Sequence, residues 1–596
     1  MDIGVGRISV VSLQESTDVV NKLIDYETNA LRFGPWRKNI VFVADDGDGN
    51  LHQSSADQLA TSIDANHPEF TTQKIYLDQY KQITEVTGQF SPACKDALDR
   101  AVEVGAGIVN YTGHGSADVW TQEQILDQAL VKSWKNGPRY PIFVTATCEF
   151  GRHDDPFEIS SGERVLLQPN GGGVALVTTA RPVNSSTNLY LNNAFYTALF
   201  TKSNGAFRDL GSIFKDTKNN SLSGVANRNF SLIGDPSMHP ALPKNQIVVD
   251  AIKTATNSDT LKGLSTVLLT AEIQQSGVRR TDFNGLSAVT LFDRPVSFVT
   301  LGDENPPFSY MQWSNALFQG QASVSSGVFQ SDFILPENIE PDVGAGKITA
   351  YADNGQEDAS GVMATQAGGL ETDVPPDNTA PNIRLFIGDT TFVDGGIASP
   401  NTTLVAQLHD AHGIAISGFG NVNDLLGILD DSLTYILNNY YTASKNDYTH
   451  GVVNCPLNNL QQGRHALVVQ ASDTYDNRTS ETIHFVVTEN NLVISEFYNY
   501  PNPFSSVSKT TIGFAHNRPG EDLEVELTIA DLTGRVVDTW QYSVSDSFTR
   551  VTLSEWDGTG AGGNKLGGGI YLGKLSVRSL LDGSKNQQFT KLIIIN

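Results

Sequence analysis

Cysteine is scarce in this sequence. Three occur in 596 residues, at Cys94, Cys148 and Cys455. Three cysteines are too few for the disulfide framework of a small secreted scaffold, and their wide spacing excludes a paired metal or redox motif. Each cysteine is therefore expected to be either a small buried hydrophobic residue or a reactive thiol.

Long apolar runs and an excess of positive charge are also missing. No stretch reaches the ~18 continuous apolar residues of a membrane-spanning helix, and no secretory signal is visible at the N-terminus. The chain has 40 Lys and Arg against 66 Asp and Glu, which gives a net charge of −26. Because phosphate binding requires a basic face, nucleic acid is not expected as a partner.

What the sequence does contain is a change of pattern along the chain. Residues 1–242 alternate apolar strands with helical patterns, which predicts an α/β domain with a mostly parallel sheet and helices on both faces. From residue 243 onward, alternating strands and frequent turn residues predict β-sandwich domains. The length fits about four domains at ~150 residues each, and a Pro-rich acidic linker lies at Glu371–Asn382. The expected domains are 1–242, 243–372, 383–490 and 491–596.

The elements of the first domain follow from its periodicity. Ser12 and Glu15 are typical of the start of a helix, and further helices are expected near Ala56–Ala65, after Pro92 and near Leu189–Phe200. The predicted strands are Ile40–Ala44, Lys74–Leu77, Gly107–Tyr111, Ile142–Ala146 and Val174–Thr178.

Two of these apolar strands lead into residues that can carry out chemistry. The strand over Gly107–Tyr111 is followed by Gly113-His114-Gly115, and the strand over Ile142–Ala146 is followed by Cys148. In a parallel sheet both ends lie at one edge, where active sites form. A thiolate there attacks a carbonyl while an imidazole moves the proton, and the N–H groups of Gly115 and Cys148 are candidates for the oxyanion site. The alternative, a turn histidine and a core cysteine, stays open.

Other cysteines and histidines in the sequence serve as comparisons. Cys94 lies in a helix led by proline and Cys455 follows only a short apolar run, so both are expected in the core. His412 and His450 precede glycine but follow polar segments, which predicts turn residues. His153 is a rival for the general base; because it lies on the same loop as Cys148, a loop role is favoured.

An acidic segment after the first predicted strand resembles a calcium loop in its spacing. Asp46, Asp48 and Asn50 fall at positions 1, 3 and 5 of such a loop, and Asp57 falls at position 12. The glycine expected at position 6 is replaced by Leu51. A structural calcium ion is one interpretation, and a solvated acidic turn is the other.

The segment NYTGHGSADVW, followed by an apolar block and Cys148, resembles the gingipain-like cysteine peptidases of the caspase–gingipain group. SLIGDPSM (Ser231–Met238) is similar to the segment that closes the catalytic domain in that family. The resemblance implies that Cys148 is the nucleophile, that His114 is the general base or acid, and that no cofactor is required. It also implies that the first part of the catalytic domain, with any signal peptide, is missing from this chain.

The β-rich segments resemble one branch of this family, the sortase of the type IX secretion system. These segments include KITAYADNGQEDASG and, near the C-terminus, YNYPNPF and LTIADLTGRVVDTW, the last two being similar to an Ig-like type IX secretion domain. The resemblance implies a cell-surface endopeptidase and transpeptidase, associated with the outer membrane.

Such an enzyme would remove the C-terminal signal domains of secreted cargo and transfer the cargo to an anionic lipopolysaccharide, next to outer-membrane partners of an attachment complex. Two alternatives stay open. One is a secreted peptidase that hydrolyses its substrate, and the other is a non-catalytic β-rich surface protein.

Overall fold

The structure is a computed structural model, and it describes residues 1–595 except 87, 255, 257, 419–424, 489, 490, 506 and 582. The chain forms two compact units, Met1–Val374 with Ser444–Asp447, and Pro375–Ala443 with Tyr448–Asn596. The ranges predicted as the first two domains thus belong to one unit, and the boundary expected at residue 490 lies outside the described residues. The division into four domains stays a prediction. Among the described helices, none is long and apolar enough to cross a membrane.

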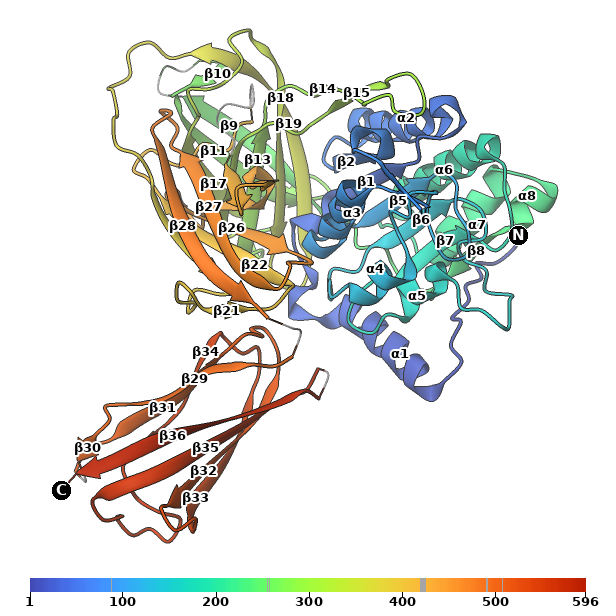
Figure 1. The fold of residues 1–596 in the computed structure, drawn as a ribbon. Coiled ribbons are helices and arrows are strands. Elements are labelled where there is room, and N and C mark those ends of the chain that lie inside the picture. The colour runs from blue at the N-terminus through green and yellow to red at the C-terminus, as the bar shows by residue number, and fades with distance from the viewer. Residues whose placement is uncertain are drawn as a thin grey trace. The chain divides into compact units, whose positions relative to one another are not determined.

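The first 242 residues form the predicted α/β domain. Its sheet has the order β2-β1-β5-β6-β7-β8, with β1 to β7 of this sheet parallel to one another and β8 antiparallel at one edge. Figure 1 shows helices around this sheet. The strands of the sheet are β1 (Asn39–Ala44), β2 (Thr71–Tyr76), β5 (Ile108–Thr112), β6 (Ile142–Ala146), β7 (Ala175–Thr179) and β8 (Phe230–Ile233). The α/β prediction is confirmed, and the antiparallel β8 is an addition to it.

Helices cover both faces of the sheet, which is why its strands are apolar on both sides. Ile40 and Phe42 of β1 pack with α2, α6 and α7, whereas Val41 and Val43 pack with α3, α4 and α5. The helices are α1 (Leu13–Thr28), α2 (Leu51–Asn66), α3 (Pro92–Val104), α4 (Gln128–Ser133), α5 (Ser161–Leu167), α6 (Ser185–Phe200), α7 (Leu210–Asn220) and α8 (Gly224–Arg228). The predicted N-cap is confirmed, since the Ser12 side chain accepts a hydrogen bond from the Glu15 N–H.

The rest of the first unit is β-structure. Its main sheet has the order β12-β11-β9-β19-β18-β13-β16, with β17 paired to β11 and β10 paired to β19. The strands are β9 (Asn245–Thr254), β10 (Thr260–Gly263), β11 (Thr266–Gln275), β12 (Val278–Arg279), β13 (Gly285–Phe292), β16 (Ala316–Val324), β17 (Val328–Ile334), β18 (Gly344–Asp353) and β19 (Asp358–Leu370).

A hairpin of this β-region reaches the α/β domain. It consists of β14 (Val296–Val299) and β15 (Ser309–Gln312), which Figure 1 shows extending toward α2. Tyr310 of β15 is buried against Tyr76 of β2, with ring centroids 4.7 Å apart. Three backbone N–H groups of the loop between the strands donate to Asp78, two of them to its carboxylate. A small second hairpin, β3 (Ile83–Glu85) with β4 (Gly88–Phe90), precedes α3.

The second unit is also built from strands, as the β-sandwich prediction requires. At its C-terminal end, sheet β29-β31-β34 and sheet β30-β36-β35-β32-β33 enclose one apolar core. The strands before this sandwich are β20 (Asn382–Ile387), β21 (Ile397–Ala398), β22 (Thr402–His409), β23 (Leu426–Leu429), β24 (Leu433–Ile436), β25 (Tyr441–Ser444), β26 (Asp447–Leu457), β27 (Gly463–Ser472) and β28 (Arg478–Val487). Those of the sandwich are β29 (Ile494–Tyr500), β30 (Phe504–Ser505), β31 (Thr510–His516), β32 (Leu523–Asp531), β33 (Val536–Val544), β34 (Arg550–Trp556), β35 (Gly569–Ser579) and β36 (Lys585–Ile595).

Candidate active site

The strand register places His114 and Cys148 at the same edge of the α/β sheet. Thr112 of β5 pairs with Ala146 of β6, so each candidate residue lies two positions beyond its last paired residue. The two strands are parallel neighbours, and the loops that follow them leave the sheet together. The structure thus brings together the two residues that the sequence singled out.

Glycines on both sides of His114 allow close contact between the two loops. A Cβ atom added to Gly115 would lie 2.6 Å from Oγ1 of Thr147, the residue before Cys148. A Cβ atom added to Gly113 would overlap both Asp45 and Tyr111. Since both positions have no room for a side chain, the Gly-His-Gly sequence is a packing requirement of this edge.

Three hydrogen bonds fix the backbone of His114. Its N–H donates to Oδ2 of Asp45 (2.7 Å), and its carbonyl oxygen accepts from the Tyr111 hydroxyl and from the Thr121 N–H. Asp45 is itself buried directly after β1, and its other carboxylate oxygen accepts from the Gly47 N–H (3.3 Å). Sequence reasoning missed Asp45; its position right after a buried strand was the one signal available.

The imidazole of His114 lies among polar side chains. The His114 side chain is 54% exposed, and its Nε2 is 3.5 Å from Oδ1 of Asp48. The other oxygen of Asp48 is 3.4 Å from Nε2 of His52, whose ring meets that of His114 edge-on at 5.2 Å. His52 is buried, and this burial lowers its pKa. The neutral form of His52 is therefore favoured beside His114.

Cys148 differs from the other two cysteines in its exposure. Cys148 is half-buried, whereas Cys94 and Cys455 are fully buried, so the packing predictions for those two are confirmed. Burial raises the pKa of the Cys94 thiol, which makes it a poor nucleophile. The Cys148 thiol donates to the Val183 carbonyl oxygen (3.5 Å). Within the described residues no hydrogen bond joins this thiol to the His114 ring.

The segment that carries His114 and Cys148 is similar to a known protein family. Residues 1–241 match the family described as peptidase family C25. We call this matched segment the C25 domain. The C25 family is one of cysteine-type peptidases, which agrees with a half-exposed cysteine and a histidine at one sheet edge. No match was found among curated proteins.

Solved structures similar to the chain include two peptidases. One is dimeric latent PorU from Porphyromonas gingivalis, with 28% identity over 67% of this chain and 39% of that chain, and a TM-score of 0.27. The other is the Arg-specific cysteine proteinase gingipain R (RgpB), with 15% identity over 62% of this chain and 75% of that chain, and a TM-score of 0.34. The chain therefore spans about two fifths of the length of the PorU chain that it matches.

Two backbone N–H groups on the loops that carry His114 and Cys148 are candidate donors for an oxyanion. The N–H groups of Gly115 and Cys148 donate no hydrogen bond to any other described residue. Hydrogen bonds fix the two carbonyl oxygens that precede Cys148 at the end of β6. The Ala146 oxygen accepts from the Asn188 side chain (2.8 Å), and the Thr147 oxygen accepts from the Thr179 hydroxyl. The two N–H groups are thus available to a ligand on a fixed backbone.

His153, the rival general base, has another partner. Its Nε2 is 3.0 Å from the Ser231 hydroxyl of β8. The neighbouring Arg152 forms ion pairs with Asp155 (3.2 Å) and Glu149 (3.8 Å) on its own loop. These contacts fit the loop role that the sequence favoured for His153.

The four residues of the predicted calcium loop do not come together. Asp57 pairs with Lys74 (2.5 Å), Asn50 donates to the Pro306 carbonyl oxygen (2.6 Å), and Asp46 accepts from Gln82. Asp48 faces the two histidines instead. Helix α2 begins within this loop, and its side chains have protein partners. Calcium binding at these four residues stays a prediction.

Different acidic and histidine side chains are grouped close together. Donor atoms of Asp45, His52 and His114 lie within 4.8 Å of one another, and so do those of Asp45, Asp46 and Glu123. Burial is the main cause that raises the pKa of Asp46 to about 7, with Asp45 contributing. The edge of the sheet is therefore crowded with carboxylates.

Two histidines outside the C25 domain test the turn prediction. His412 lies in a turn, where Gly413 has a φ of +90°, so that prediction is confirmed. His450 lies inside β26, paired with His409 of β22, so the turn prediction is wrong there. The polar sequence around His450 belongs to an exposed strand face, which a turn signal does not distinguish.

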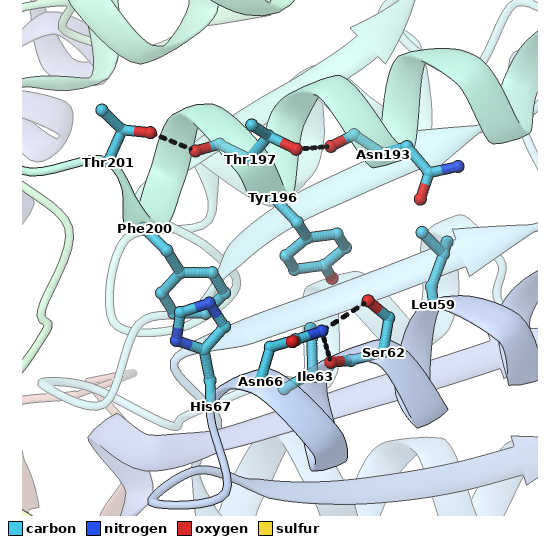
Figure 2. Close-up of a pocket in the computed structure, with 10 residues that line it drawn as sticks. All are labelled: Leu59, Ser62, Ile63, Asn66, His67, Asn193, Tyr196, Thr197, Phe200 and Thr201. Atoms are coloured by element: carbon cyan, nitrogen blue, oxygen red, sulfur yellow. Dashed lines mark hydrogen bonds between the residues drawn. The ribbon is translucent and has the colours of Figure 1, made fainter.

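A cavity of about 330 Å³ lies between α2 and α6 of the C25 domain. Figure 2 shows Tyr196 of α6 pointing toward α2, and His67 stacked on Phe200 with ring centroids 3.7 Å apart. The cavity is lined by the later turns of α2, whereas His52 lies in the first turn. It is therefore separate from the edge that carries His114 and Cys148.

Proposed function

We propose that the C25 domain of this chain is a cysteine endopeptidase in which Cys148 is the nucleophile and His114 is the general base and acid. The observation that carries the proposal is the register of β5 and β6, which sets both residues at equal distance past the sheet. The half-exposed thiol and the matching family support the same assignment.

The proposed reaction uses the groups at this edge in sequence. The His114 imidazole takes the thiol proton, and the thiolate sulfur forms a bond to the scissile carbonyl carbon. The N–H groups of Gly115 and Cys148 hold the oxyanion. The C–N bond then breaks, the imidazolium returns its proton to the leaving amine, and a thioester on Cys148 remains. An incoming amine or water resolves the thioester and restores the thiol.

We further propose that an amine resolves the thioester, as in a PorU-type sortase. The segments KITAYADNGQEDASG and YNYPNPF support this choice, together with the similarity to PorU. In this proposal the substrate is secreted cargo of the type IX system, which loses its C-terminal signal domain. The acceptor is an anionic lipopolysaccharide, and the enzyme acts at the cell surface beside outer-membrane attachment partners.

The decisive experiment replaces Cys148 by alanine in the complete protein. Cargo that keeps its C-terminal domain should accumulate in this variant, whereas Cys94→Ala and Cys455→Ala should process cargo as before. Mass spectrometry of processed cargo then separates the two outcomes for the thioester: an amine adduct supports the sortase, and a free carboxylate supports a hydrolysing peptidase. Normal processing in the folded Cys148→Ala variant would exclude both.

A further inference from the structure

We propose that His52, His114, Asp48 and Asp45 form a binding site for one Zn²⁺ ion, and that bound zinc withdraws His114 from catalysis. This inference extends the proposed function, because it assigns a means of inhibition to the same edge. The binding of the ion does not depend on the proposed reaction, whereas the inhibition does.

The first evidence is the state of His52. This residue lies in the first turn of α2 and is 2% exposed. Its Nε2 is buried and has no hydrogen-bond partner among the described residues. Most buried polar side-chain atoms in proteins are paired. This buried ring nitrogen lies close to a second histidine ring and is therefore a candidate metal ligand.

The second evidence is the spacing of the donor atoms. Tetrahedral zinc with bonds of about 2.0–2.1 Å sets neighbouring donors about 3.3–3.4 Å apart. Oδ2 of Asp48 lies 3.4 Å from Nε2 of His52, and Oδ1 of the same carboxylate lies 3.5 Å from Nε2 of His114. These distances exceed those of ordinary hydrogen bonds. Each of them is close to one edge of a zinc coordination tetrahedron, with one carboxylate oxygen toward each histidine.

Asp45 supplies the remaining ligand atom. One of its carboxylate oxygens, Nε2 or Nδ1 of His52 and a ring nitrogen of His114 all lie within 4.8 Å of one another. The backbone N–H groups of His114 and Gly47 hold this carboxylate in place without using all of its lone pairs. With Asp48, the four side chains offer four candidate donors around one space.

The donor set selects the type of metal. Two imidazole nitrogens with carboxylate oxygens suit Zn²⁺, whereas Ca²⁺ and Mg²⁺ prefer oxygen ligands alone. The proposed zinc site differs from the predicted calcium loop in every ligand except Asp48. Asp48 is 43% exposed, which leaves a route for the ion from solvent.

Coordination changes what His114 can do. When a ring nitrogen gives its lone pair to zinc, the other nitrogen carries the proton of the neutral ring. The ring then has no free lone pair with which to take the proton of the Cys148 thiol. Zinc would therefore block formation of the thiolate without touching the sulfur.

The test measures Zn²⁺ affinity of the 596-residue chain by competition with a chromophoric chelator. A His412→Gln background removes the separate group formed by Asp377, Asp410 and His412. Two variants target the site, His52→Gln and Asp48→Asn, and the second changes a half-exposed side chain that the core does not require. His67→Gln is the matched control, since His67 follows the other end of α2. Cys148→Ala tests whether the thiol is a ligand.

We expect one zinc ion bound per chain, with affinity at least about 10-fold weaker in His52→Gln and Asp48→Asn, and unchanged affinity in His67→Gln and Cys148→Ala. Zinc should inhibit peptide cleavage by the active protein and should inhibit Asp48→Asn less. The proposal is overturned if the parent chain binds no zinc, if Asp48→Asn binds as tightly as the parent, or if Cys148→Ala loses binding. A chain that binds zinc as expected but cleaves no peptide would contradict the proposed function alone.

Discussion

Asp45 holds His114 through its backbone and not through its ring: the Asp45 Oδ2 atom accepts the His114 N–H at 2.7 Å. This contact links the end of β1 to the loop after β5, because Ala44 and Thr112 are paired neighbours in the sheet. The imidazole therefore depends for its position on a carboxylate that is 69 residues earlier in the chain.

Removal of this carboxylate should misplace His114. We expect Asp45→Ala to lower kcat/KM for peptide cleavage by about 10- to 100-fold, mostly through kcat, because loss of the N–H acceptor lets the histidine loop shift. Asp45→Asn keeps an acceptor oxygen and should recover much of the loss. The control is Asp154→Ala, which removes an exposed ion pair with Arg181. Equal activity in Asp45→Ala and the parent would contradict the role.

Gly115 should tolerate no side chain. The Cβ of Gly115→Ala would lie 2.6 Å from Thr147 Oγ1, so the loops that carry His114 and Cys148 have to separate. We expect a loss of at least about 10-fold in kcat/KM with little change in Tm. Gly567→Ala is the matched control, since a Cβ there meets no atom within 4 Å. Steady-state kinetics and thermal unfolding on both variants check this prediction, which a fully active Gly115→Ala protein would refute.

The three thiols should differ in reactivity. Cys148 is half-buried, whereas the other two are buried. We expect iodoacetamide to modify Cys148 at least about 10-fold faster than Cys94 or Cys455 in the native protein. All three should react in denaturant, which serves as the control. Peptide mapping by mass spectrometry gives the three rates, and similar native rates would argue for the non-catalytic alternative.

Lys22 should make stability depend on pH. Its ammonium group is buried and donates to the carbonyl oxygens of Leu166 (2.7 Å) and Gly171 (2.8 Å). Burial lowers its pKa from 10.5 to about 7. Between pH 7 and 10.5 the unfolded chain therefore binds more protons at this residue, so the contribution of Lys22 to stability rises with pH.

The variant Lys22→Met leaves those carbonyl oxygens without a donor and should destabilise the domain by about 2 kcal/mol. The Tm difference between the parent and this variant should widen from pH 7 to pH 9. Lys132→Met changes an exposed lysine and should show neither effect. A Tm difference that is constant over this range would show that Lys22 keeps its charge when folded.

The sequence predicts the framework of the site better than its details. Buried parallel strands appear as short apolar runs, so β1, β5, β6 and β7 were predictable, and with them the edge where His114 and Cys148 lie. The short helices α4 and α5 and the antiparallel β8 were not, because brief elements give weak periodicity. The longer helices α1, α2, α3 and α6 followed from local pattern, whereas α7 was not predicted.

Residues that depend on contacts distant in sequence were not predictable. The role of Asp45 follows from the pairing of β1 with β5, which local patterns do not reveal. The calcium loop was predicted from spacing alone, and its side chains are bound instead by Lys74, Gln82 and the Pro306 carbonyl oxygen. His52 has no distinguishing sequence signal, since a histidine inside a helix is common.

The hairpin of β14 and β15 supports part of the active-site edge of residues 1–242. Asn305 donates to the Asp46 carbonyl oxygen (2.6 Å), and Asn50 donates to the Pro306 carbonyl oxygen (2.6 Å). The loop between β14 and β15 is thus hydrogen-bonded to the chain both before and after Asp48. The segment that matches a peptidase family is thus held in part by residues outside it. A graft of residues 1–242 onto another scaffold would leave the Asp48 turn without these two hydrogen bonds, so directed evolution of this chain should vary both ranges together.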